Sequence, residues 1–169
     1  MAETFETYVE RILGYMGGRD PMAILRATPR VLEKRILGLP RRTLARQPAR
    51  DKWSIGQILA HLSEMEMLWG YRIRTILEQD RPAIVGMDQD AWAKNSRYER
   101  LDPGRSLATL RVLRRANLEL LDALSPRALR RHGSHSQFGR LTIARITELL
   151  AGHDLNHTLQ IDAILRRKS

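Results

Sequence analysis

The sequence predicts an all-α protein built as a four-helix bundle. Three observations support this class: long segments with apolar residues at helical spacing, capping residues where those segments begin, and no segment with convincing strand alternation. Of the 169 residues, 43% are hydrophobic and 28% are charged, which is typical of one ordinary globular domain. We therefore expect a single helical domain over residues 1–169, with its core at about residues 20–167.

The first long helix is expected to begin at Asp20-Pro21. A carboxylate can cap a helix start, and proline is tolerated at the first helical position. The helical pattern then continues to Gly38-Leu39-Pro40. Pro29 interrupts this segment, and Thr28 could cap a second start there, so we expect a kinked or split helix. Residues 41–52 are expected to form a loop with room for one helical turn.

The second helix has the clearest start signal in the chain. Ser54 and Gln57 form a capping box, and apolar residues follow at helical spacing from Ile55 to Leu77. Residues 79–82 end the helix, and residues up to 100 form a long connection to the third helix. Connections of this length are uncommon in compact domains and often carry functional residues.

The third and fourth helices are marked by single capping residues. Ser106 is expected to begin the third helix, which ends before Ser125-Pro126. A polar loop is expected at residues 130–140, where His132 and His135 should be exposed, although His135 could border the site. Thr142 is expected to begin the fourth helix, which reaches the basic residues 166–168.

Composition excludes several classes of function. The chain contains no cysteine, so disulfides, thiolate metal ligands and a cysteine nucleophile are excluded. The net charge of +10 comes from dispersed basic residues, and aromatic residues are only 5%, so we expect a solvated basic surface and no nucleic-acid partner. The N-terminal 18 residues fit neither a signal peptide nor an anchor, and no apolar run could span a membrane. We therefore expect a cytoplasmic protein that acts on a small molecule.

Three histidines are predicted to face the interior of the bundle. His153 and His157 are four residues apart and thus lie on one face of the fourth helix, in the same stripe as the apolar Ile146 and Leu150. His61 lies on the inward stripe of the second helix. Buried neutral imidazoles need partners, and zinc or a similar ion accepts nitrogen ligands. The alternative is that the histidines only form hydrogen bonds with their neighbours.

A divalent metal on three histidines would keep one coordination position open for water or substrate. Gln160, one turn after His157, is expected to orient that ligand. Glu64, one turn after His61, could accept a hydrogen bond or act as a general base, or could be an exposed carboxylate.

Further candidates surround this predicted centre. Arg72, Asp88 and Trp92 are pocket candidates, while Asp88 could instead cap a helix and Trp92 could belong to the core. Glu66 is rotated away from His61, so we expect it to pair with Arg72 or with a base on the surface.

Four segments of the chain resemble the DinB/YfiT-like superfamily of metal-dependent enzymes. They are Lys52-Trp53-Ser54-Ile55, His61-Leu62 with Glu66 and Arg72 following, the glycine-containing connection at residues 86–92, and the motif from Gly152 to His157 with Gln160. The likeness covers about residues 20–167. It implies an up-up-down-down bundle with a long connection between the second and third helices. It also implies zinc or nickel on His61, His153 and His157, and a homodimer.

The resemblance implies more than one activity. Characterised members of the family include low-molecular-weight thiol S-transferases and a thiol-dependent maleylpyruvate isomerase. From the sequence we therefore expect a thiol S-transferase that acts on small electrophiles and uses a low-molecular-weight thiol. A metal-dependent hydrolase is the first alternative, and a non-catalytic metal-binding stress protein is the second.

Overall fold

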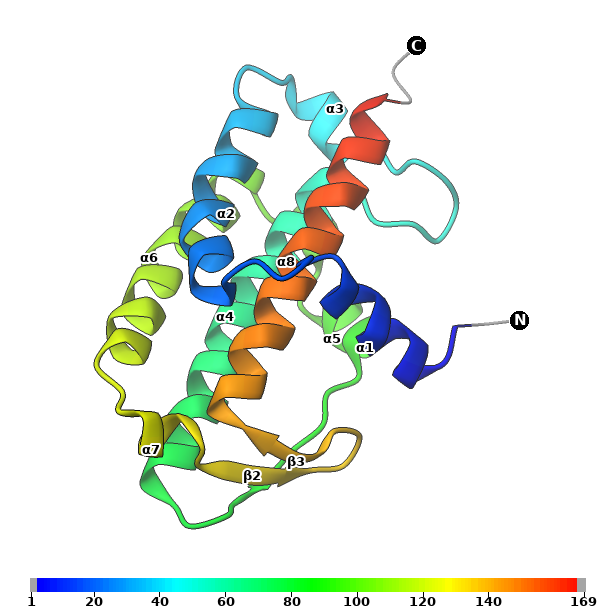
Figure 1. The fold of residues 1–169 in the computed structure, drawn as a ribbon. Coiled ribbons are helices and arrows are strands. Elements are labelled where there is room, and N and C mark those ends of the chain that lie inside the picture. The colour runs from blue at the N-terminus through cyan, green and yellow to red at the C-terminus, as the bar shows by residue number, and fades with distance from the viewer. Residues whose placement is uncertain (1–2, 167–169) are drawn as a thin grey trace.

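Four long helices form a bundle in the computed structural model, which describes residues 3–166 (Figure 1). Helix α2 packs against α8 and α6, while α4 packs against α6 and α8. The predicted four-helix bundle is therefore confirmed. The helices are α2 (Pro21–Ile36), α4 (Ile55–Glu78), α6 (Pro103–Asp122) and α8 (Ile143–Arg166).

The directions of the helices follow from their connections. Helices α2 and α8 run toward one end of the bundle, and α4 and α6 run toward the other (Figure 1). In the order α2, α8, α4, α6 around the bundle, two neighbouring helices run up and the next two run down. The predicted up-up-down-down pattern thus applies around the bundle, whereas along the chain the order is up, down, down, up.

Several shorter helices cover the bundle. Helix α1 (Phe5–Gly14), which the sequence did not predict, packs against α8. The connection between α4 and α6 contains α5 (Gln89–Asn95) and the 3₁₀ helix η1 (Tyr98–Arg100). Two further short helices are α3 (Arg41–Ala45) and α7 (Pro126–Leu129). None of the helices within residues 3–166 is both long enough and apolar enough to cross a membrane.

A small three-stranded sheet closes one end of the bundle, so the expectation of no strands was wrong. Strand β1 (Ala83–Ile84) pairs in parallel with β2 (His132–His135), and β2 pairs in antiparallel with β3 (Gly139–Thr142). Strands of two to four residues are too short to show a convincing alternation of apolar and polar residues. The pairing joins the end of α4 to the start of α8.

Arg131 reinforces this junction between α4 and α8. Its side chain donates hydrogen bonds to the carbonyl oxygens of Ile76 and Gln79 at the end of α4. Its own carbonyl accepts a hydrogen bond from the backbone N–H of Ile143, the first residue of α8. One residue therefore satisfies backbone groups at both helix ends.

Pro29 does not split α2, which is continuous from Pro21 to Ile36, so the expected split was wrong. Proline lacks the N–H that would bind the carbonyl oxygen of Leu25, four residues earlier. That oxygen instead accepts a hydrogen bond of 2.8 Å from Nη1 of Arg114 in α6. Thr28 does not cap a new helix, because its hydroxyl donates to the carbonyl of Ile24 within the same helix. A tertiary contact thus replaces the missing helical bond.

Helix α6 begins earlier than the sequence indicated. Asp102 caps the helix by accepting a hydrogen bond from the backbone N–H of Arg105, and Pro103 occupies the first turn. Ser106, the predicted cap, lies buried within the helix. The aspartate-proline start is the same signal that correctly predicted α2.

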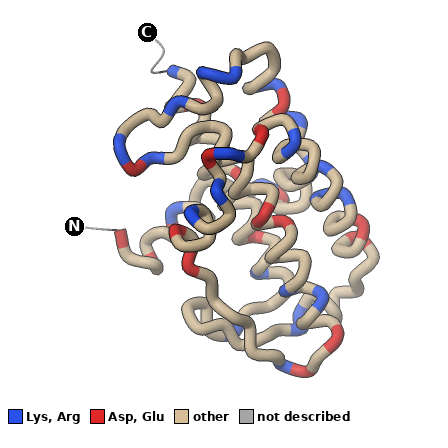
Figure 2. Tube along the Cα trace, turned by 180° about the vertical axis from the view of Figure 1, so that it is seen from behind, with Lys and Arg blue, Asp and Glu red and all other residues tan. Residues whose placement is uncertain are grey.

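The charged residues are distributed over the whole surface. Figure 2 shows Lys and Arg on several helices and loops, with Asp and Glu between them. The hydrophobic core runs along the bundle in two main clusters of buried side chains. Buried polar side chains interrupt this core, and those on α4 and α8 define the site described next.

Candidate metal centre

Three histidines from two antiparallel helices meet inside the bundle. The capping box of Ser54 and Gln57 fixes the start of α4 and thereby the face on which His61 lies. His61 is fully buried and His157 is buried, whereas His153 is partly exposed as a residue although Nδ1 of its ring is buried. The spacing of four residues in α8 places His153 and His157 on the face opposite His61.

The imidazoles approach each other through their Nε2 atoms. Nε2 of His153 lies 2.9 Å from Nε2 of His61 and 3.1 Å from Nε2 of His157. Taken together, these three residues offer ligand atoms that all lie within 4.8 Å of one another. The three side chains therefore present one nitrogen each to a common point.

Hydrogen bonding within the protein cannot satisfy this arrangement. Nε2 of a neutral imidazole either carries one hydrogen or offers one lone pair, so His153 cannot make full hydrogen bonds to both neighbours. A single cation can accept all three lone pairs. Two nitrogens bound to one ion at about 2.0 to 2.1 Å lie about 2.9 to 3.4 Å apart for ligand angles between square and tetrahedral values. The two separations measured from Nε2 of His153, 2.9 and 3.1 Å, fit that range.

Burial keeps the three imidazoles neutral. It lowers the pKa of His61 and of His157 well below the usual value, and the neighbouring histidines lower both further. Burial and the positive charge of Arg114 lower the pKa of His153 to about 4. Because a neutral imidazole is the form that binds metal, the lone pairs are available at neutral pH.

Gln160 fixes the orientation of one histidine through a hydrogen bond. Its Oε1 lies 2.9 Å from Nδ1 of His157, and because an amide oxygen only accepts, Nδ1 carries the hydrogen. Nε2 of His157 therefore directs its lone pair toward the other two rings. Among residues 3–166, Nδ1 of His61 and Nδ1 of His153 have no hydrogen-bond partner.

Two aromatic rings lie close to the histidines. The ring of Trp53 stacks on that of His157, with centroids 6.3 Å apart and an angle of 16°, and lies 4.8 Å from the ring of His61. Tyr98 lies 6.4 Å from His61 and donates its hydroxyl to Glu64 at 2.9 Å. Glu64 therefore accepts a hydrogen bond from Tyr98, and within residues 3–166 no hydrogen bond joins Glu64 to a histidine. Burial raises the pKa of Tyr98, and the hydrogen bond to Glu64 raises it further.

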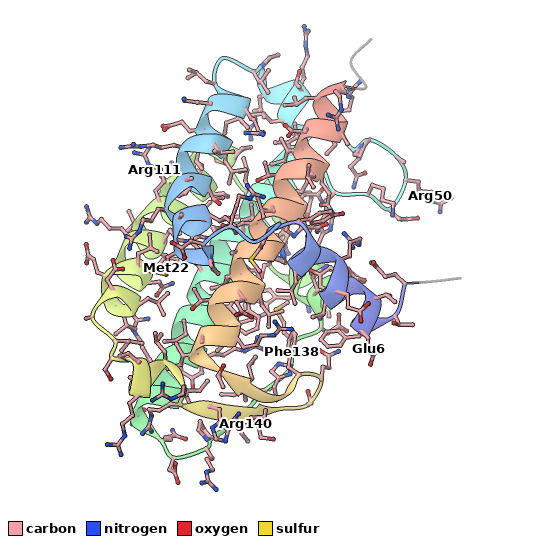
Figure 3. All side chains as sticks on the ribbon, in the orientation of Figure 1. Glu6, Met22, Arg50, Arg111, Phe138 and Arg140 are labelled. Carbon is pink, nitrogen blue, oxygen red and sulfur yellow. The ribbon has the colours of Figure 1, made fainter. Side chains whose placement is uncertain are left out.

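A cavity of about 610 Å³ opens beside His157. Of the three histidines only His157 borders it, together with Gln160 and the ring of Trp53. The loop at residues 48–53 forms its outer rim, from which Arg50 points away from the bundle (Figure 3). The side chains of Asp51 and Asp90 add two carboxylates to the wall.

Three other predicted pocket residues do not reach this cavity. Asp88 caps α5 by accepting hydrogen bonds from the backbone N–H groups of Asp90 and Ala91, which is the alternative that the sequence left open. Trp92 is half-buried on α5 and is absent from the cavity wall. Arg72 lies eleven residues after His61, which is about 16 Å along α4.

A buried charged cluster lies beside the histidines and was missed in the sequence. Arg114 donates to Glu66 at 2.7 Å and to both carboxylate oxygens of Asp154 at 2.8 and 3.2 Å. The expectation that Glu66 pairs with Arg72 or a surface base was wrong, because Glu66 is only 1% exposed and binds Arg114 and Asn117. All these residues occupy the apolar stripes of their helices, and this position in the sequence could have indicated that they are buried.

His135 also lies elsewhere than expected. It is buried rather than exposed, and its strand β2 places it beside β1. His132 is half-buried at the other end of the same strand. The short sheet, which the sequence did not reveal, turns one side chain of this segment inward.

Comparison with known proteins assigns the family. A sequence profile described as the DinB superfamily matches residues 24–161. The chain belongs to the DinB superfamily. Its relatives include a protein from Oceanobacillus iheyensis, 26% identical over 140 residues, covering 83% of this chain and 81% of the relative. YfiT from Bacillus subtilis is 29% identical over 122 residues, covering 71% and 68%. Both are named as candidate metal-dependent hydrolases.

The fold of this DinB-superfamily protein is also found in a solved structure. The structure of YfiT from Bacillus subtilis, described as having an unusual four-helix bundle topology, matches with a TM-score of 0.81. The match covers 98% of this chain and 90% of YfiT at 22% sequence identity. At that identity, the structural likeness establishes the shared fold.

Proposed function

We propose that this DinB-superfamily protein is a metal-dependent hydrolase whose His61, His153 and His157 hold one divalent ion, zinc or nickel. The observation that carries this proposal is the convergence of three Nε2 atoms at 2.9 and 3.1 Å, which protein hydrogen bonds cannot satisfy. The names of relatives from Bacillus subtilis and Oceanobacillus iheyensis, as candidate metal-dependent hydrolases, support the same activity.

The chemistry requires an open coordination position. A divalent ion on three nitrogen ligands activates a water molecule as a nucleophile near neutral pH. Within residues 3–166, the group of side chains that could hold this ion contains only the three histidines. A structural site is normally closed by a fourth protein ligand. The three-residue set therefore favours a catalytic site over the non-catalytic alternative.

Residues of the chain would control access to this position. His157 borders the cavity of about 610 Å³, so a substrate that enters there meets the histidine centre from that side. Trp53 covers the rings of His61 and His157 and limits the water that reaches them. Gln160 holds the ring of His157 in the orientation that binds the ion.

A thiol S-transferase is the second candidate. The same open position could bind the thiolate of a low-molecular-weight thiol, because zinc and nickel accept sulfur ligands. The cavity volume is sufficient for this possibility, since pockets for drug-sized ligands are about 300 to 1,000 Å³ and the cavity falls within that range. A thiol and a small electrophile could therefore lie side by side.

Turnover with and without thiol distinguishes the two candidates. Protein loaded with zinc or nickel is tested on small esters, lactones and amides in the absence of thiol. It is then tested on chloro-nitroaromatic and epoxide acceptors with common bacterial thiols. We expect hydrolysis without thiol, lost in His153→Ala and retained in His132→Ala. Failure to bind a stoichiometric divalent ion would refute both candidates, and activity only with thiol would favour the transferase.

A further inference from the structure

A second cluster of buried polar groups lies between α4 and the sheet, away from the histidine centre. Arg72 is only 5% exposed, and its Nη2 donates to the carbonyl oxygen of Val85 at 2.6 Å. Its Nε has no hydrogen-bond partner among residues 3–166, and no carboxylate of those residues forms an ion pair with it. Burial lowers the pKa of Arg72 to about 10, so it is charged at neutral pH.

His135 supplies a second unpaired donor. Its Nδ1 accepts hydrogen bonds from the backbone N–H groups of Gln137 at 3.1 Å and Phe138 at 3.4 Å. In the neutral imidazole the hydrogen must then reside on Nε2. His135 is 4% exposed, and its Nε2 has no partner within the described residues. A buried N–H group therefore lacks an acceptor.

Two independent sets of contacts make Arg72 and His135 neighbours. Arg72 binds the carbonyl of Val85, which directly follows Ile84, the residue paired with His135 in the sheet. The Arg72 guanidinium also lies 4.4 Å from the centroid of the Trp69 ring.

The ring of Phe138 completes the second set of contacts. It lies 6.2 Å from the ring of Trp69 and 4.9 Å from that of His135. Figure 3 shows Phe138 between the β2–β3 hairpin and α1. The guanidinium of Arg72 and the imidazole of His135 thus lie against the same pair of aromatic rings. Burial lowers the pKa of His135, and the positive charge of Arg72 lowers it further.

We propose that Arg72 and His135 form a binding site for a small oxyanion, either a carboxylate or a phosphate group. Two unpaired N–H donors require an acceptor, and an anionic acceptor also compensates the buried guanidinium charge. Water could accept both hydrogen bonds but would leave the charge uncompensated. The site is distinct from the histidine centre, since His61 and Arg72 are about 16 Å apart along α4.

Wild-type protein provides the first test. Inorganic phosphate and sodium acetate are titrated in separate NMR experiments at constant ionic strength, balanced with chloride. We expect saturable shifts of the backbone amide resonances of Gln137 and Phe138, which report on the His135 ring, while amides of α3 stay unchanged. Saturation with phosphate alone identifies a phosphate site, and saturation with acetate alone identifies a carboxylate site. The absence of saturable shifts with either anion overturns the proposal.

Two variants test the assigned residues. The amide oxygen of Asn can replace Nδ1 as an acceptor, so His135→Asn removes the Nε2–H donor but keeps the turn. Arg72→Gln removes the charge. We expect the dissociation constant, measured by calorimetry, to rise at least tenfold in each variant and to stay unchanged in His132→Asn, on the same strand. Unchanged affinity in folded His135→Asn and Arg72→Gln contradicts the assignment. If a variant does not fold, the wild-type titration decides.

Discussion

Arg114 and Asp154 form a buried two-pronged ion pair, in which Nη1 and Nη2 donate to Oδ2 and Oδ1 at 2.8 and 3.2 Å. Asp154 directly follows His153 in α8. The same guanidinium binds Glu66, which lies five residues after His61 in α4. Both helices that carry the candidate metal ligands are therefore fixed to α6 through one arginine, and its removal should affect the whole centre.

We predict that Arg114→Met lowers the free energy of unfolding by about 3 to 5 kcal/mol, because two buried carboxylates lose their counterion. Asp154→Asn should have a smaller effect, since the pair of Arg114 and Glu66 remains balanced. Urea denaturation measures the free energy of unfolding of both variants. Arg111, labelled in Figure 3, forms an exposed ion pair with Glu33 and provides the control. Arg111→Met should change stability by less than about 1 kcal/mol. Equal losses in Arg114→Met and Arg111→Met would contradict the assigned role.

The close approach of α1 and α8 depends on Gly152. A Cβ atom at this position would lie 2.5 Å from the carbonyl oxygen of Ile12, a backbone atom that cannot move alone. Gly152→Ala should therefore destabilise the protein by about 1 to 3 kcal/mol, as measured by thermal unfolding. Gly14→Ala is the matched control, because nothing lies within 4 Å of its added Cβ and alanine favours helix. A neutral Gly152→Ala would show that α1 does not pack as described.

Gln160 should increase metal affinity without being a ligand. Gln160→Leu removes the acceptor for Nδ1 of His157, and loss of such a partner typically weakens metal binding about 10- to 100-fold. Competition with a chromophoric chelator measures the dissociation constant for zinc. Gln89→Leu, also on the cavity wall, should leave it unchanged. Identical affinities in the wild type and Gln160→Leu would rule out this orienting role.

Metal binding should stabilise the fold measurably. An ion that binds only the folded state at 100 times its dissociation constant adds about 2.7 kcal/mol to the free energy of unfolding. We therefore expect a chelator to lower the Tm of wild-type protein and of His132→Ala, but not that of His61→Ala. Calorimetric scans with and without chelator make this comparison. If the chelator leaves the Tm of all three proteins unchanged, that result would argue against the proposed ion.

Local signals predicted much of the fold, because the capping box at Ser54 and the aspartate-proline start at Asp20 act within a few residues. The position of the three histidines followed from helical spacing alone. The continuity of α2 could not be predicted in this way, since the carbonyl freed by Pro29 is satisfied by Arg114 from a distant helix. The sheet depends on pairing between β1 and β2, about 50 residues apart, which a local pattern does not record.

The charged cluster was predictable in part. Arg114 lies in the same buried stripe of α6 as Leu110 and Leu121, and Glu66 and Asp154 occupy the equivalent stripes of α4 and α8. Helical spacing alone places these charges inside the bundle. Which charges pair, and how far His135 is buried, depends on tertiary packing that spacing does not specify.

The sheet and Arg131 tie the last turn of α4 to the first turn of α8, so these two helices share a fixed base. His61 lies about 25 Å above that base, and His157 about 20 Å. At such a height, a tilt of a few degrees between α4 and α8 changes the separation of their rings by about 1 Å or more. The distances between the three histidines and a bound ion therefore depend on small tilts of α4 and α8 that hardly change the contacts at the base.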